Sequence, residues 1–468
     1  MLSACSTIGG VVDAVNPFDE TEKERLEAQG EVADDTSRIS ILELSDTLTV
    51  GGSVAPGDVV LPAAYVNTDW PQVGGNTQNV VQHTGASGNL DKAWSKDIGK
   101  ASGRKSRVLA PPVIAAGVIY TMDGDNRVTA IEEASGKELW DYKVSVNARE
   151  KTRKGKTGIV ERIRDPRSFF DGSGEDKESV GGGVAYGDGK IFISSGLGVM
   201  TALDATTGEY IWSTPTRTPL HSGPSYDNGR VFSISDDNEL FAFNAFSGEV
   251  IWTYQGIIES ARMLTVPSPA IKDDVIVAPF SSGELVALQV QNGGVLWQDA
   301  LSSSARLTPL ATLNDIAAGP VIVDGYVIAT AQSGVMTAFD FRTGQRVWSQ
   351  PAGSIGMPLV AGDFVYTVTT DSKVACLSKL DGSVAWIQPL KTYKKVKKKK
   401  GRVVWSGPIL ASDRLFLASS EGRTVTISPY DGSILSEGKI GDPVFVPPVI
   451  ANETVYVVTD KAKLVALR

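Results

Sequence analysis

The sequence predicts an all-β protein, an eight-bladed β-propeller whose blades are four-stranded antiparallel sheets. Two observations predict this class: a motif with Gly and then Trp recurs along the chain, and short β-rich runs separated by turn residues lie between successive motifs. The number of blades follows from a third observation, an unmatched strand at each end of the repeat region.

The repeat is clearest around its tryptophans. Its full form, Ala-x-Asp-x-x-Thr-Gly-x-x-x-Trp, occupies 202–212 and 338–348. Other copies keep Trp four residues after Gly, except that Ser436 takes the Trp position after Gly432. The shortest spacing between two such tryptophans is 38 residues, between positions 348 and 386. Four short strands in about 40 residues are typical of one propeller blade.

Each element of a blade follows from a local pattern. In the first complete repeat, 112–114 and 118–120 are expected to be strands separated by an Ala-Gly turn, and 128–131 is the third strand. The Thr/Ser/Asp-Gly step then supplies the positive φ of a tight hairpin turn. The fourth strand begins at Glu138-Leu139-Trp140.

The two ends of the chain complement each other. The chain stops at Arg468 after the third strand of an eighth repeat, and a spare Trp strand, 90–94, precedes the first complete blade. We therefore expect the strand around Trp94 to complete the last blade and close the ring, which removes two open sheet edges.

One tryptophan per blade at the same position indicates packing between blades rather than a ligand cage. The expected inter-blade residues are Trp94, Trp140, Trp212, Trp252, Trp297, Trp348 and Trp386.

Composition excludes several classes of function. Two His and two Cys cannot build a histidine-rich metal centre or an all-cysteine zinc site. A net charge of −9 argues against a general nucleic-acid binder. No apolar run approaches the roughly 20 residues that a membrane-spanning helix needs.

The N-terminus predicts a lipid anchor. Leu2-Ser3-Ala4-Cys5 has the form of a lipobox, in which an apolar residue and two small ones precede a Cys that is acylated after cleavage. We expect 1–5 to be a signal remnant ending at lipidated Cys5. The expected organisation continues with a tether and extended segment over 6–62 and the propeller over 63–468.

The repeat resembles that of PQQ-type propellers, a superfamily that includes quinoprotein dehydrogenases and the BamB family. The lipobox and Trp70-Pro71-Gln72-Val73-Gly74-Gly75-Asn76 are similar to the BamB family, the outer-membrane β-barrel assembly lipoproteins. The resemblance implies a non-enzymatic scaffold of the BAM complex on the periplasmic face of the outer membrane, a monomer within a hetero-complex. It also implies binding to BamA, other BAM subunits and unfolded outer-membrane protein precursors, with no nucleic acid. The alternative is a periplasmic or cell-envelope ligand-binding propeller without a role in barrel assembly.

The candidate partner site lies on two connections between blades. The loop 257–264 and the loop 305–316 carry apolar residues and charges that no blade requires, and loops on a rigid scaffold are usual binding sites. The resemblance implies that these loops contact BamA. The residues expected to bind BamA are Arg262, Met263, Leu264, Arg306, Leu313 and Asp315.

An enzyme of the quinoprotein branch is not expected. Such an enzyme would have an adjacent Cys pair, whereas Cys5 and Cys376 are far apart, so we expect no cofactor, no metal and no catalytic residue. Cys376 is expected to be a buried thiol, and His83 and His221 are expected to be surface or cap residues.

Two segments are strongly basic. Residues 391–402 contain eight Lys/Arg, and 149–167 contain eight Lys/Arg against three acids. Either they form solvated excursions or they attract an anionic lipid surface or acidic partner. The possible anionic-surface patch comprises Lys394, Lys395, Lys397, Lys398, Lys399 and Lys400.

Overall fold

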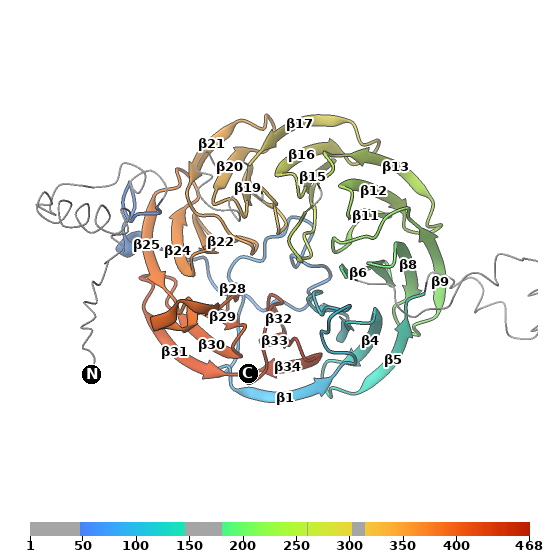
Figure 1. Ribbon diagram of the computed structural model, residues 1–468, viewed down its shortest axis with the longest axis horizontal. Coiled ribbons are helices and arrows are strands. Elements are labelled where there is room, and N and C mark those ends of the chain that lie inside the picture. Colours follow the sequence, from blue (N-terminus) through green and yellow to red (C-terminus); the bar gives the residue numbers. More distant parts are fainter. Residues whose placement is uncertain (1–46, 146–179, 260, 302–313) are drawn as a thin grey trace, which may run out of the picture. The chain divides into compact units, whose positions relative to one another are not determined.

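The computed structural model describes residues 47–145, 180–259, 261–301 and 314–468. Eight four-stranded antiparallel sheets stand around a common axis, so the predicted fold class is confirmed (Figure 1). Within each sheet the strands run in chain order from the axis to the rim, except in the last blade, whose outer strand is β1.

The first four blades have the following strands, from the axis outward. Blade 1 has β2 (Val113–Ala115), β3 (Val118–Met122), β4 (Arg127–Glu132) and β5 (Glu138–Lys143). Blade 2 has β6 (Gly182–Gly187), β7 (Lys190–Ser195), β8 (Val199–Asp204) and β9 (Tyr210–Pro215). Blade 3 has β10 (Ser225–Asp227), β11 (Arg230–Ile234), β12 (Glu239–Asn244) and β13 (Val250–Gln255). Blade 4 has β14 (Ala270–Lys272), β15 (Val275–Pro279), β16 (Glu284–Gln289) and β17 (Val295–Ala300).

The remaining blades follow the same plan. Blade 5 has β18 (Val321–Val323), β19 (Tyr326–Thr330), β20 (Met336–Asp340) and β21 (Arg346–Gln350). Blade 6 has β22 (Leu359–Ala361), β23 (Phe364–Val368), β24 (Lys373–Ser378) and β25 (Val384–Pro389). Blade 7 has β28 (Trp405–Leu410), β29 (Leu415–Ser419), β30 (Arg423–Ile427) and β31 (Ile434–Lys439). Blade 8 has β32 (Val449–Ala451), β33 (Thr454–Val458), β34 (Lys463–Leu467) and β1 (Lys92–Asp97).

A separate two-stranded hairpin lies between blades 6 and 7. It consists of β26 (Tyr393–Lys395), the 3-10 turn η4 (Val396–Lys398) and β27 (Lys400–Arg402). A second 3-10 turn, η1 (Pro56–Asp58), lies near the N-terminal end of the described chain.

The ring closes through β1, which pairs antiparallel with β34 and places Trp94 opposite Ala466. Blade 8 thus takes three strands from the C-terminus and one from the N-terminus. This is the arrangement that the unmatched strands in the sequence predict, and it pairs the outer edge of β34, which would otherwise be open.

In blades 1 to 6, the Gly–Trp motif joins each blade to the next. Trp348 faces the small Ala338 of its own blade, its indole N–H donates to the Lys379 carbonyl of blade 6 at 2.8 Å, and its ring lies against Gly382 there. The same donation to the following blade occurs at Trp140, Trp212, Trp252, Trp297 and Trp386. The recurring Ala, Gly and Trp are therefore parts of one inter-blade contact.

The way the ring closes explains why the seventh copy of the motif has Ser436 in place of Trp. Ser436, at the Trp position of blade 7, would have to face the turn between the third and fourth strands of blade 8. That turn does not exist, because β34 and β1 are not consecutive in the chain: β34 ends at Leu467, and β1 begins at Lys92. A tryptophan there would have no hairpin glycine to pack against.

A segment of the N-terminal region forms a collar inside the ring, over residues 67–84 (Figure 1). In every blade this collar hydrogen-bonds to the inner strand or to the turn directly after it. From blade 1 to blade 8 the bonded pairs are Trp70–Ile114, Pro71–Tyr186, Gln72–Tyr226, Thr77–Ile271, Gln78–Ile322, Gln82–Gly362, Thr84–Ser412 and Asn67–Asn452. The collar therefore satisfies polar groups on the axial side of all eight blades, where unpaired backbone groups would be costly.

Candidate functional site

Loop elaboration is concentrated at one end of the blades, which we call the loop face. In a four-stranded meander, the connections between blades and the turns between second and third strands emerge at this end. Asp236, in the turn between β11 and β12, contacts Arg262, in the connection from blade 3 to blade 4. This contact places both kinds of loop on the same face.

Arg262 holds its connection against blade 3. Its guanidinium donates to the Asp236 carboxylate at 2.5 Å and to the Met263 carbonyl at 3.3 Å, and its side chain is 15% exposed. The Asp236 carboxylate also lies 3.5 Å from Nδ1 of His221. Burial lowers the pKa of His221, and the neighbouring Asp236 only partly opposes this effect.

Asp315 joins the two candidate loops to each other. Its carboxylate accepts a hydrogen bond from the backbone N–H of Met263 at 2.6 Å, across 52 residues of sequence. The side chain is buried, and burial raises the pKa of Asp315 to about 6 against the lowering effects of the Met263 N–H and of Arg262. Asp315 therefore fixes the spacing of the loops from beneath the surface.

Three aliphatic side chains project from the first of these loops. Ile257, Ile258 and Leu264 are 59%, 64% and 51% exposed. Apolar side chains at this exposure on a loop are candidates for burial by a partner. We call Ile257, Ile258 and Leu264 the apolar patch.

The structure brings some of the predicted site residues together, and others lie outside the described residues. Arg262, Met263 and Asp315 come together as one bonded cluster, with Leu264 exposed beside them. The sequence reasoning missed Asp236 as the partner of Arg262, because nothing local links two residues 26 positions apart. Arg306, Leu313, Cys5 and the basic segment 149–167 lie outside the described residues.

The two histidines correct an expectation. His83 and His221 are each only 3% exposed, so they are not surface residues. The ring of His83 bridges Pro62 and Asp413, with Nδ1 2.7 Å from the Pro62 carbonyl and Nε2 accepting the Asp413 N–H at 3.0 Å. The ring thus ties the N-terminal segment to blade 7, a role that depends on tertiary contacts.

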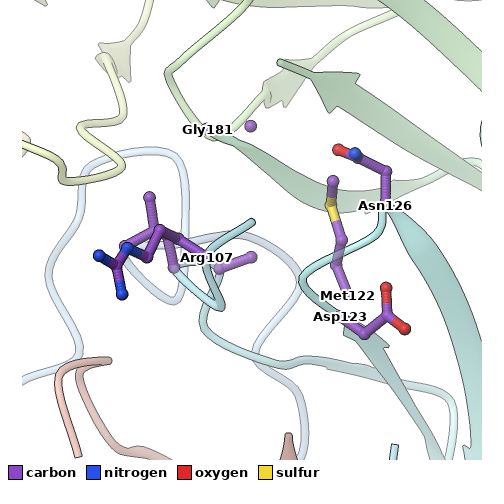
Figure 2. Close-up of a pocket in the computed structure, with 8 residues that line it drawn as sticks. Arg107, Met122, Asp123, Asn126 and Gly181 are labelled. Atoms are coloured by element: carbon purple, nitrogen blue, oxygen red, sulfur yellow. The ribbon is translucent and has the colours of Figure 1, made fainter. Parts of the chain in front are cut away.

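A small hollow lies near the axis on the loop face of blades 1 and 2. Figure 2 shows Arg107, Met122, Asp123, Asn126 and Gly181 around it. It is small and partly open to solvent. The Asp123 carboxylate is already used by backbone N–H groups, among them that of Lys100 at 2.7 Å.

The remaining metal-ligating and nucleophilic side chains form no further candidate site among the described residues. Within the described ranges, no three His, Cys, Asp or Glu side chains are grouped so that they could hold a metal ion. Cys376 is fully buried, and burial raises the pKa of its thiol to about 12. None of the helical segments that the structure describes is long and apolar enough to cross a membrane.

The basic residues of 391–402 form the ordered hairpin between blades 6 and 7. Lys394 and Lys395 lie on β26, Lys397 and Lys398 in η4, and Lys400 on β27. Lys399 stands at the tip with a positive φ of 45°. All six lysines are exposed.

Comparison with known proteins gives a consistent result. The family model described as outer membrane protein assembly factor BamB matches residues 172–388, and a dehydrogenase β-propeller model matches 83–211. The chain is 31% identical over 360 residues to the outer membrane protein assembly factor BamB of Salmonella typhimurium, covering 77% of this chain and 84% of that protein.

Solved structures share the fold. The crystal structure of BamB from Moraxella catarrhalis superposes with a TM-score of 0.63 at 17% identity, covering 81% of this chain and 99% of that one. A europium-containing methanol dehydrogenase superposes with a TM-score of 0.61 at 14% identity, covering 84% and 89%. At these identities the structures establish the propeller architecture, while function depends on individual sites.

Proposed function

Because the chain belongs to the BamB family of outer membrane protein assembly factors, we infer that it is a subunit of the complex that assembles β-barrel proteins in the outer membrane. The observation that carries this inference is the 31% identity to a BamB protein over 77% of the chain. The match extends over most of both chains, so it reaches beyond a single blade repeat.

We propose that the protein works as a non-enzymatic scaffold, held at the periplasmic face of the outer membrane by acyl groups on Cys5. The collar supports the scaffold role, because it bonds to all eight blades along the axis.

The proposed docking site for BamA is the apolar patch together with the cluster beneath it. In this proposal Ile257, Ile258 and Leu264 enter the interface, and Arg306 and Leu313 contribute from the second loop. Arg262 and Asp315 act mainly as positioning residues, since Arg262 is bound to Asp236 and Asp315 to the Met263 N–H. Such an arrangement presents apolar anchors on a backbone that needs little ordering when a partner binds.

Unfolded barrel precursors are a second proposed partner, bound along the rim. Outer strands of six blades carry an exposed aliphatic residue next to the Trp position, and an extended chain can pair with an exposed strand edge. These residues are Leu139, Ile211, Ile251, Leu296, Val347 and Leu435. Blade 6 differs, because Gly51 pairs with Val384 of β25 and the adjoining Ala385 is fully buried.

The docking proposal is tested by co-purification from solubilised envelope. Ile258→Asp combined with Leu264→Asp places two charges in the patch and should reduce recovery of BamA at least about tenfold, since two buried apolar anchors are lost. The matched control is Leu380→Asp, at 55% exposure in the turn between β24 and β25, at the opposite end of the blades.

Equal recovery of BamA with both variants would refute the docking site while leaving the family assignment intact. Loss of BamA with the control variant as well would point to general instability, which thermal unfolding of each purified variant detects.

A further inference from the structure

The hairpin between blades 6 and 7, residues 391–402, is anchored at its base, and we call it the lysine hairpin. Its base is fastened on both sides: Lys391 pairs with Glu421 at 2.7 Å, and the Arg402 guanidinium donates to the Thr370 carbonyl. The indole N–H of Trp405 donates to the Lys391 carbonyl at 3.0 Å. The hairpin is therefore held on the loop face, between the turns that join the second and third strands of blades 6 and 7.

Its charge is opposite to that of the rest of the protein. The whole chain has 45 Lys and Arg against 54 Asp and Glu. The lysine hairpin holds eight of the basic residues and no acid, so the remainder has 37 basic against 54 acidic residues, a difference of −17. A local charge of +8 on an acidic body creates a strong positive field at one place on the surface.

Among the described residues, no carboxylate neutralises the tip of the hairpin. Across the ranges that the structure describes, none of the six lysines at 394, 395 and 397–400 has a carboxylate within the 4.0 Å of an ion pair. Val396, at the start of η4, is 65% exposed among them. The tip thus presents unpaired ammonium groups around one exposed aliphatic side chain.

We propose that the lysine hairpin binds the surface of an anionic phospholipid membrane. Lysine ammonium groups act as point charges and need no fixed geometry, which suits a fluid array of phosphates better than a specific carboxylate on a protein. Val396 then meets the boundary between headgroups and acyl chains, where a small apolar group is accepted.

The course of the chain supports a membrane as the occupant. The described N-terminal segment reaches the ring at blade 6, where Gly51 pairs with Val384 at the start of β25. The lysine hairpin follows the other end of the same strand. The 41 residues between Cys5 and Thr47 can span far more than the roughly 20 Å length of a six-residue strand. This step rests on the proposed anchor at Cys5: a chain of this length allows the anchor and the hairpin to contact the same membrane.

The experiment measures binding of the full chain, with Cys5→Ser so that no acyl group contributes, to vesicles of 70% phosphatidylcholine and 30% phosphatidylglycerol. We expect binding at low salt, its loss at high salt, and none to pure phosphatidylcholine. Replacing Lys394, Lys395, Lys397 and Lys398 by Gln should weaken binding at least about tenfold. Replacing the same four by Arg should retain it, because the charge is kept.

The control replaces four other exposed lysines by Gln, so that net charge changes equally. These are Lys92, Lys100, Lys137 and Lys439, none of which has an ion pair within the described part of the chain. Equal weakening by both sets, or equal binding to both vesicle types, would overturn the proposal.

A protein partner gives a different result. If the unacylated chain ignored anionic vesicles and the Gln variant lost an acidic protein from envelope extracts, the hairpin would be a protein-docking element and the membrane proposal would be wrong. Because the vesicle assay uses purified protein, its failure is separable from failure of BamA co-purification.

Discussion

A stability prediction follows from one contact between blades. The glycine in the last hairpin of a blade lies against the tryptophan of the blade before it. Gly382 has φ of +73°, and a Cβ built on it would lie 2.8 Å from Cδ2 of Trp348. Gly382→Ala should therefore cost about 1–2 kcal/mol for the left-handed backbone and about 1–3 kcal/mol more for overpacking against the indole.

Gly136 supplies the matched control, because it occupies the same position of its repeat. Its φ is +69°, but a Cβ there would lie 3.8 Å from the nearest Trp94 atom, an ordinary contact. Gly136→Ala should incur the backbone cost alone, about 1–2 kcal/mol. The difference between the two variants isolates the cost of overpacking.

Urea denaturation followed by far-ultraviolet circular dichroism gives both values. Adding Trp348→Leu should remove most of the extra cost of Gly382→Ala, since the smaller side chain leaves room for the methyl group. Equal costs for Gly382→Ala and Gly136→Ala would refute the reasoning: the glycines would then be required for φ alone, and the tryptophan contact would not restrict them.

Two further predictions concern buried ionisable groups. Burial raises the pKa of Asp315 to about 6 from 3.8. Between about pH 4 and pH 6 the folded state therefore holds a proton that the unfolded chain releases, so the free energy of unfolding falls as pH rises. Asp315→Asn should remove up to about 3 kcal/mol of this pH dependence, measured by urea midpoints at pH 4 and pH 7; an unchanged slope would contradict the assigned burial. Cys376, with its thiol pKa raised to about 12 by burial, should resist a thiol reagent at pH 8 and react only after unfolding, and labelling of the native chain would show that blade 6 opens.

The local sequence was sufficient for the blades because each blade is a local structure. Successive strands pair with one another, and the turn glycines, such as Gly208 at φ +72°, are required where two strands meet. The blade number followed from counting such units, and it is confirmed by the eight sheets. Ser436 was visible as an exception, but its reason appeared only when the ring showed that blade 8 lacks the corresponding turn.

The site depended on contacts between loops that are far apart in the sequence and neighbours in the ring. Sequence reasoning placed Arg262 and Asp315 on adjacent loops, yet their bonds to Asp236 and to the Met263 N–H span 26 and 52 residues. The burial of His221 has the same origin, since the residue lies against Asp236 of blade 3 and Gly181 at the start of blade 2.

Composition and spacing by themselves determined the repeat, its strands, the closure of the ring and the run of lysines at 394–400. Tertiary structure decided which side chains on the loops are exposed and which only hold the loops in place. It also decided that the collar 67–84 would contact every blade. The physical reason is that strand pairing and turn geometry act between neighbours in sequence, whereas burial depends on what the completed ring brings alongside.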